Sequence, residues 1–199
     1  MTAHIRSGVL RRGTQIYAAG DQSNAVFTVR VGVVKLVMAI PGRESRIVRL
    51  LGRGATLGLE ALAGKPYAHT AVAVRTTSLC RIPVPTVDEL HVHNPQILHG
   101  LMAKWNEQVE WADRWITILG SGPVRQRLAD LIRLIADISG DHLDAVHLPP
   151  VADIAAILGI TPEAVSRNLA ELKRDRLLTH VGPRTYQCDR ALFETQDAR

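Results

Sequence analysis

Three polar residues, Glu163, Ser166 and Arg167, are expected to project from a helix away from its apolar face. Their chemistry suits the reading of DNA bases. Arginine can donate two hydrogen bonds to guanine O6 and N7, glutamate can accept one from cytosine N4, and serine can contact a base or a phosphate. These residues predict a recognition helix that lies in the major groove.

Two short helices joined by a glycine turn are needed to position these side chains. Apolar residues recur with helical spacing over residues 151–158. Gly159 can end that helix because glycine accepts a positive φ. Thr161 can cap a second helix, and Pro162 suits its first position. The pattern predicts a helix-turn-helix, although ordinary helix bundles also contain such pairs.

A β-hairpin is predicted directly after the second helix. Apolar and β-branched residues over 177–181 and 184–188 flank a turn at Gly182-Pro183. A hairpin behind a recognition helix is typical of a wing, so this segment favours a winged helix-turn-helix over a plain bundle.

Positive charge in the C-terminal part is concentrated at a few positions, because the part as a whole has no excess of basic residues. Residues 121–199 hold 10 basic and 11 acidic side chains. A surface that binds phosphates must therefore be a stripe of cations. The stripe is predicted to contain Arg167, Lys173, Arg174, Arg176 and Arg184, with Arg125, Arg127 and Arg133 upstream.

The segment ITPEAVSRNLAELKRDRLLTHVG resembles the winged helix-turn-helix of the CRP/FNR superfamily of transcription regulators. Its Glu163-x-x-Ser166-Arg167 is similar to the E-x-x-S-R motif of the fumarate and nitrate reductase regulator branch. The resemblance implies that these three residues read a TTGA-like half-site of a palindromic operator. Asn168 replaces an apolar residue often found there, and is either a further polar contact or a solvated side chain. The expected DNA contacts are Thr161, Glu163, Ser166, Arg167, Asn168, Lys173, Arg174 and Arg184.

The N-terminal part reads as many short strands separated by glycine turns, which indicates a small sandwich or β-roll. The strand-like runs are 15–17, 25–31, 33–40, 46–51 and 69–82. The segment RRGTQIYAAGDQSNAVFTVRVGVVKLVM is similar to the cyclic-nucleotide-binding roll of the same superfamily. The expected fold class is α+β, with a roll over residues 1–92, a dimerisation helix over 93–120 and a winged helix-turn-helix over 121–199.

The roll departs from the family pattern at the sites of its known effectors. Leu59, Tyr67 and Ala68 stand where a cyclic-AMP receptor would have Glu, Arg and Ser, so cyclic-nucleotide binding is not expected. No cysteine precedes Cys80, so on ligand count an N-terminal [4Fe–4S] cluster is not expected. Cys80 and Cys188 are expected to be reduced strand residues.

Candidate residues for an effector pocket remain in the roll: Leu59, Glu60, Tyr67 and His69. His69 is either a partly buried, hydrogen-bonded histidine or a ligand of haem, as in some sensors of the superfamily. His91, His93 and His99 invite a metal reading, but they lie at a helix entrance without a supporting carboxylate or cysteine. No metal site and no cofactor are expected, with haem as the one alternative.

A long helix is predicted from about Asn94 to Leu119. Its apolar residues are spaced alternately four and three apart, as in a two-stranded coiled coil, although a helix buried in its own domain could also show this. These residues are Leu98, Met102, Trp105, Val109, Ala112, Ile116 and Leu119. A second stripe at Leu101, Gln108 and Trp115 can pack against the roll. Residues 120–123, Gly-Ser-Gly-Pro, predict a hinge. Helical periodicity of the apolar residues resumes over residues 124–139, which predicts a further helix there.

Together these features predict a homodimeric, sequence-specific DNA-binding regulator, with RNA polymerase as a further partner. No arrangement of catalytic residues indicates an enzyme. No apolar run approaches the roughly 18–20 residues that span a bilayer, and the N-terminus has no signal-peptide core, so we expect a cytoplasmic protein. The input stays open between a switch with an unidentified effector, a haem-based gas or redox sensor, and a constitutive DNA binder with a vestigial roll.

Overall fold

The computed structural model describes residues 5–94 and 96–194, except for the side chains of residues 91, 93, 98 and 194. Its contacts divide the chain into two compact units. The first comprises residues 1–39 and 48–113, and the second comprises residues 40–47 and 114–199. Strands and helices occur in both units, which confirms the predicted α+β class.

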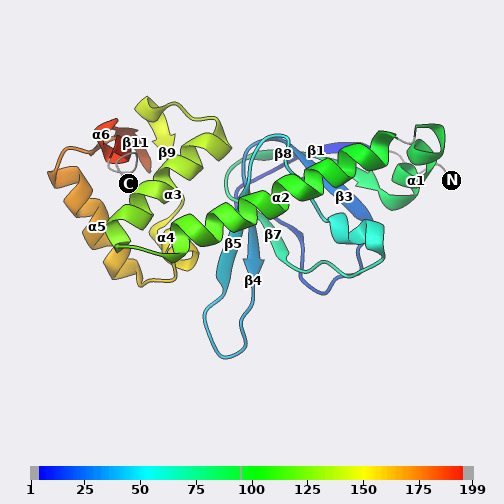
Figure 1. Cartoon of the computed structure of the whole chain (residues 1–199), viewed down its shortest axis with the longest axis horizontal. Coiled ribbons are helices and arrows are strands. Elements are labelled where there is room, and N and C mark those ends of the chain that lie inside the picture. The colour runs from blue at the N-terminus through cyan, green and yellow to red at the C-terminus, as the bar shows by residue number, and fades with distance from the viewer. Residues whose placement is uncertain (1–4, 95, 195–199) are drawn as a thin grey trace. The chain divides into compact units, whose positions relative to one another are not determined.

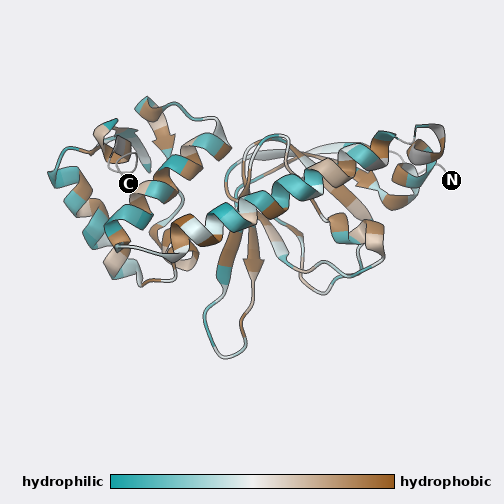
Figure 2. Ribbon diagram, in the orientation of Figure 1, coloured by the Kyte–Doolittle hydropathy of each residue, from teal (hydrophilic) through white to brown (hydrophobic). Residues whose placement is uncertain are grey.

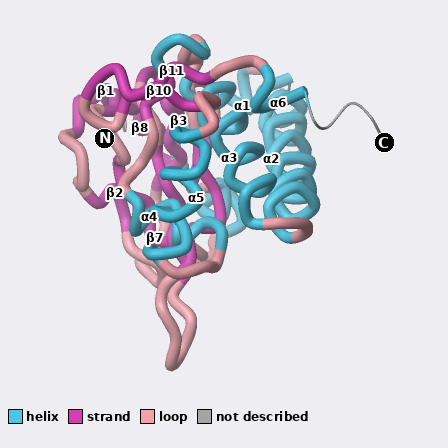
Figure 3. Tube along the Cα trace, turned by 90° about the vertical axis from the view of Figure 1, so that its left-hand side faces the viewer, coloured by secondary structure: helices cyan, strands magenta, loops and turns pink. Residues whose placement is uncertain are grey.

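The first unit is a β-roll built from two four-stranded sheets (Figure 1). Their strand orders are β1-β8-β3-β6 and β2-β7-β4-β5. The strands are β1 (Arg6–Leu10), β2 (Gln15–Tyr17), β3 (Ala25–Val31), β4 (Val34–Met38), β5 (Arg46–Leu51), β6 (Thr56–Leu57), β7 (Thr70–Ala73) and β8 (Thr77–Pro83). Strands β1 and β8 pair antiparallel and run side by side (Figure 3). The predicted roll is therefore confirmed.

Alternation along the strands places one set of side chains in the core of the roll. In β3, Ala25, Phe27 and Val29 are buried, as the period of two requires. The core is completed chiefly by Tyr17, Val34, Leu36, Leu51, Leu57, Tyr67, Ala71 and Leu79. Burial of this apolar surface is what holds the two sheets together.

The run 69–82, read from sequence as one strand, is two strands, β7 and β8. Strand β7 pairs with β2 and β4, whereas β8 pairs with β1 and β3 in the other sheet. The chain must therefore change sheets between Ala73 and Thr77. The single-strand prediction was wrong because apolar and β-branched residues continue through the crossing, where only tertiary pairing marks the break.

Two helices follow the roll strands, and only the second was predicted. Helix α1 (Val84–His93) occupies residues assigned from sequence to the end of the roll. Its Val84, Val87 and Thr86 are β-branched and have low helix propensity, which hid the helix. Helix α2 (Gln96–Gly120) agrees within two residues with the predicted long helix. Among the described helices, none is long and apolar enough to cross a membrane.

Besides the end of α2, the described residues of the second unit contain four α-helices, a short 3-10 helix (Leu143–Ala145) and a three-stranded sheet of order β10-β11-β9. The elements are α3 (Val124–Ser139), β9 (Val146–His147), α4 (Val151–Leu158), α5 (Pro162–Arg174), β10 (Leu178–Gly182), β11 (Thr185–Cys188) and α6 (Ala191–Glu194). The bounds of α3, α4 and the hairpin match the sequence reading closely, whereas α6 was not predicted. Much of the core of the second unit is formed by fully buried Leu128, Ile132, Ile154, Leu172 and Leu178.

Both cysteines are free thiols that lie in strands. Cys80, in β8, is half-buried, and Cys188, in β11, is buried. Burial raises the pKa of the Cys188 thiol to about 11, because a thiolate is poorly solvated there. The expectation of reduced strand cysteines agrees with this structure.

Candidate nucleic-acid interface

The turn between α4 and α5 has the geometry that the sequence predicts. Gly159 ends α4 with a φ of 66°, and its N–H donates to the Ala155 carbonyl at 2.8 Å. Thr161 precedes α5 in an extended conformation, and its Oγ1 accepts a hydrogen bond from the Ala164 N–H at 3.2 Å. A glycine stop followed by a threonine cap fixes where each helix ends.

Helix α5 has one buried face and one exposed face. Val165, Leu169 and Leu172 are buried, whereas Glu163, Ser166, Arg167 and Ala170 are exposed. The hydropathy view shows the corresponding alternation of hydrophobic bands with hydrophilic ones along this helix (Figure 2). The structure records no hydrogen bond or ion pair between the side chains of Glu163, Ser166 or Arg167 and any described residue. The predicted base-reading trio is thus exposed and unengaged.

Two of the expected DNA contacts also serve the protein itself. The Thr161 hydroxyl is the cap of α5, as described above. The half-buried Asn168 donates from Nδ2 to the Ala164 carbonyl at 2.9 Å, one helical turn earlier. The Asn168 amide thus already has a partner within the helix, and a DNA contact by Asn168 stays a prediction.

The predicted wing is a β-hairpin formed by β10 and β11, which lie beside each other (Figure 3). Arg184, in the turn between them, adopts a left-handed backbone with a φ of 55°, which is strained for a residue other than glycine. Its carbonyl accepts a hydrogen bond from the Leu148 N–H at 2.9 Å, which ties the turn to the segment before α4. The Arg184 side chain is therefore carried by a well-defined turn.

Lys173 and Arg174 occupy the last turn of α5 and are exposed. The Lys173 ammonium lies over the ring of Tyr186 in β11, 5.0 Å from its centroid. That ring in turn meets His180 of β10 edge-on, with 5.4 Å between centroids. Tyr186 and His180 were not among the residues selected from sequence, because nothing local shows that a wing strand packs against the recognition helix.

The three upstream arginines of the predicted stripe have contacts inside the unit. Arg125 pairs with Asp175 at 2.6 Å. Arg127 donates from Nε to the Leu119 carbonyl at 2.6 Å and from Nη2 to the Leu158 carbonyl. Arg133 lies 5.8 Å from the centroid of the Phe193 ring. Each of the three side chains thus has a contact within the protein, and their part in a phosphate-binding stripe stays a prediction.

Helix α2 exposes most of the apolar seam predicted for dimerisation. Met102 is 71% exposed, Val109 47% and Ile116 70%, and Trp105 is similarly open. Such exposure is unusual for large apolar side chains in a row. Ala112 is half-buried, and Leu119 is buried, at 3% exposure. The side chain of Leu98 lies outside the described residues.

Two of the four residues of the candidate effector pocket are packed inside the roll. Leu59 and Tyr67 are buried. The Tyr67 ring stacks on Tyr17 with 3.8 Å between centroids and 16° between planes, and its hydroxyl donates to the Ala25 carbonyl at 2.8 Å. A Cβ at Gly58 would come within 2.9 Å of the Tyr67 ring, so glycine is required beside it.

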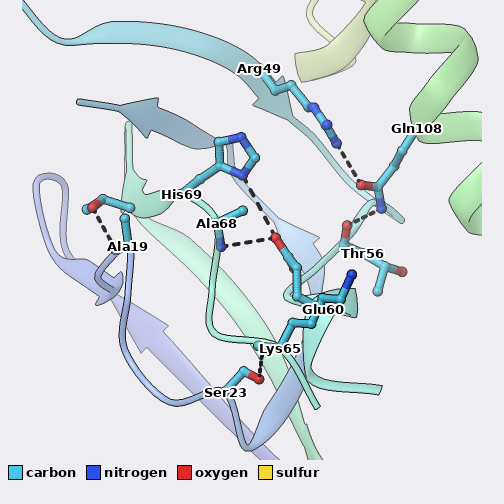
Figure 4. Close-up of polar contacts among 10 residues, drawn as sticks. Ala19, Ser23, Arg49, Thr56, Glu60, Lys65, Ala68, His69 and Gln108 are labelled. Carbon is cyan, nitrogen blue, oxygen red and sulfur yellow. Dashed lines mark hydrogen bonds and ion pairs between the residues drawn. The ribbon is translucent and has the colours of Figure 1, made fainter. Parts of the chain in front are cut away.

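Glu60 and His69 form a polar pair at the edge of this cluster (Figure 4). The Glu60 Oε1 lies 3.8 Å from the His69 Nδ1 and accepts a hydrogen bond from the Ala68 N–H at 3.3 Å. The interaction with His69 lowers the pKa of Glu60 below its ordinary value, although burial acts in the opposite direction. Burial, with a smaller effect from Glu60, raises the pKa of the Tyr17 hydroxyl, which therefore stays neutral.

A second polar contact joins α2 to the roll through Gln108 (Figure 4). Its Nε2 donates to the Thr56 carbonyl at 2.6 Å, and its Oε1 accepts from Arg49 Nη1 at 3.0 Å. Gln108 thus packs against the roll, as predicted for the second stripe of this helix.

The histidines predicted to lack a metal role cannot all be placed. The side chains of His91 and His93 lie outside the described residues, and His99 is exposed. Over the part of the chain that is described, no group of three or more potential metal ligands comes together.

Comparisons with known proteins agree with this architecture. The model of the cyclic nucleotide-binding domain matches residues 8–94, and that of the Crp-like helix-turn-helix domain matches residues 126–194. Over 181 residues the chain is 30% identical to transcriptional activator protein FnrA of Stutzerimonas stutzeri, covering 89% of this chain and 74% of that protein. It is 26% identical to transcriptional activator protein anr of Pseudomonas aeruginosa, covering 92% and 77%. The solved structure of FixK2 from Bradyrhizobium japonicum aligns with a TM-score of 0.84 over 99% of both chains, at 22% identity.

The fold and the exposed α5 surface therefore define a transcription regulator with a helix-turn-helix DNA-binding domain. The chain belongs to the CRP/FNR family, in which a cyclic-nucleotide-binding-type roll precedes a Crp-like helix-turn-helix.

Proposed function

We propose that the chain acts as a homodimer that binds a palindromic operator with TTGA-like half-sites. The exposed and unengaged trio of Glu163, Ser166 and Arg167 on α5 is the observation that carries this proposal. The open seam of α2 supports a dimer, since pairing of two such helices would bury Met102 and Val109. Two recognition helices about 34 Å apart could then enter successive major grooves.

The first test is an anisotropy titration of the purified protein against a duplex that contains TTGA-N6-TCAA. A scrambled duplex serves as competitor. We expect tight binding that the scrambled duplex does not displace, because base contacts add to the phosphate contacts common to all DNA. Equal affinity for the two duplexes would contradict the proposed operator.

We further propose that this dimer binds its operator without a small effector. Stacked Tyr17 and Tyr67 occupy the roll interior. Because position 67 is a tyrosine, the chain lacks the arginine guanidinium that would hold a phosphate there. Addition of cyclic nucleotides should leave the operator affinity unchanged. The haem-sensor alternative rests on His69, which is paired with Glu60. It would be favoured by a Soret band that appears on haem addition and is lost in His69→Ala.

The names of the relatives FnrA and anr as transcriptional activators support a further partner. We propose that the DNA-bound dimer contacts RNA polymerase in the cytoplasm. Transcription in vitro from a promoter that carries the operator tests this contact, and the scrambled operator is its control.

A further inference from the structure

Lys173 is exposed like the base-reading trio, and it follows Ser166 by seven residues, or about two turns, so it lies near the other end of α5. It follows Glu163 by ten residues, which corresponds to about 15 Å along the axis. Recognition helices contact bases through their N-terminal part, and the major groove is about 12 Å wide. If α5 reads bases through Glu163 and Arg167, Lys173 therefore lies beyond the base edges, at the sugar-phosphate backbone.

A free lysine side chain is a poor way to hold a charge at a defined place. It has four rotatable bonds, and ordering it costs conformational entropy. Here the ammonium is over the Tyr186 ring, 5.0 Å from the centroid. The structure records no ion pair for Lys173 with any described residue. The ring is thus the one recorded contact that orders this cation within the described part of the chain.

Tyr186 is in turn placed by the wing. It pairs with His180 across the hairpin, and it lies two residues before the buried Cys188, hence on the same face of β11. Through the Tyr186 ring, that face meets Lys173 of α5. The edge-on contact with His180 supports the ring from the other strand.

We propose that Tyr186 is a positioning residue for DNA binding, whose ring holds the Lys173 ammonium between the recognition helix and the wing, where it meets a backbone phosphate of the operator. This inference rests on the proposed function. It makes a neutral wing residue responsible for part of the electrostatic affinity, which neither the sequence motif nor the family match assigns.

The test compares variants of the full chain in anisotropy titrations on operator and scrambled duplexes at several salt concentrations. Tyr186→Ile keeps a residue suited to a strand but removes the ring, and Tyr186→Phe keeps the ring. Gln187→Leu, at the exposed neighbouring position on the other face, is the matched control. Lys173→Met removes the cation, and the double variant Lys173→Met with Tyr186→Ile tests whether both act through one contact.

We expect Tyr186→Ile to weaken binding to both duplexes by about threefold to tenfold, as loss of one phosphate contact per protomer would. The slope of log K against log salt should become shallower by about 0.9 per protomer. Tyr186→Phe and Gln187→Leu should match the wild type, and the double variant should be no weaker than Lys173→Met.

Several results would overturn the inference. One is unchanged or tighter binding by Tyr186→Ile. That result would mean that the ring does not contribute to DNA binding, or that it holds Lys173 away from the DNA. Another is a loss of affinity with an unchanged salt slope, which a merely structural role would produce. If Tyr186→Ile does not fold, a Lys173→Met variant with the wild-type salt slope overturns it equally. Wild-type protein that binds no duplex would instead refute the proposed function itself.

Discussion

One arginine on α5 and one on the wing are expected to make different kinds of DNA contact. Arg167 is exposed on the recognition helix, whereas Arg184 is at the turn of the wing. A bidentate contact between arginine and guanine discriminates between bases, but a contact with phosphate does not. The two arginines should therefore differ in the specificity of their effects.

Arg167→Ala should weaken operator binding by on the order of 1–3 kcal/mol and relax base preference at one position of each half-site. Arg184 requires a different substitution, because its φ of 55° would strain alanine. Arg184→Gly keeps the turn and should weaken binding to all sequences alike. Titration of both variants against operator and scrambled duplexes checks this. Equal losses on both duplexes for Arg167→Ala would contradict a base-reading role.

In the roll, the pair of Glu60 and His69 makes a prediction about pH. The pKa of Glu60 is lowered in the folded state, so its ionised form stabilises the fold. That stabilisation is present above the pKa of an unfolded glutamate, about 4.3, and is lost as the pH falls through the lower folded value. His69→Phe removes the main cause of the shift and should move acid unfolding to higher pH.

Acid unfolding followed by circular dichroism measures this effect. The Glu60→Gln background is the control, because there the carboxylate is absent and His69→Phe should no longer change the midpoint. A midpoint shift of the same size in both backgrounds would show that His69 acts through packing rather than through Glu60.

At the scale of elements, Arg127 joins the ends of two helices. Its guanidinium binds the carbonyls of Leu119, in the last turn of α2, and of Leu158, in the last turn of α4. Carbonyls at helix ends lack partners in their own helix. The residues of the predicted hinge, 120–123, are thus spanned by a side chain that holds the helices on either side.

Arg127→Met should lower the free energy of unfolding by about 1–3 kcal/mol, since half-buried carbonyls lose charged donors. Arg125→Met is a matched control on the same helix. Its ion pair with Asp175 is largely exposed, so the expected loss is below about 1 kcal/mol. Urea unfolding of both variants gives the comparison. If Arg127→Met lowers the free energy of unfolding no more than Arg125→Met does, the hydrogen bonds from Arg127 to the two helix ends do not stabilise the fold as proposed.

At the scale of the whole molecule, the open seam of α2 predicts the assembly. Val109→Glu places a charge in the middle of that seam, where a coiled coil would bury it without a partner. The variant should be monomeric at micromolar concentration in sedimentation experiments and should bind the operator weakly, since one half-site remains unread. Ala103→Glu, exposed on α2 but off the seam, should remain a dimer. A monomeric wild type would refute this assembly.

Local sequence patterns were enough to predict the helix-turn-helix, the wing, α3 and most strands of the roll. Each depends on neighbours in the chain: a glycine stop at Gly159, a threonine cap at Thr161, or alternation along β3. Such signals fail where propensity and structure disagree, as in α1, which is a helix although several of its residues are β-branched. They also fail where a run of strand-like residues passes from one sheet to the other, as between β7 and β8.

Only the tertiary structure determined which contacts each of several chemically similar residues makes. Sequence treats Arg125, Arg127 and Arg133 as cations of one stripe, but packing gives each an internal contact. It likewise brings Tyr186 beneath Lys173, and Tyr67 onto Tyr17. These contacts join residues that are distant in the chain. They depend on how whole elements pack, and no local pattern of residue types specifies that.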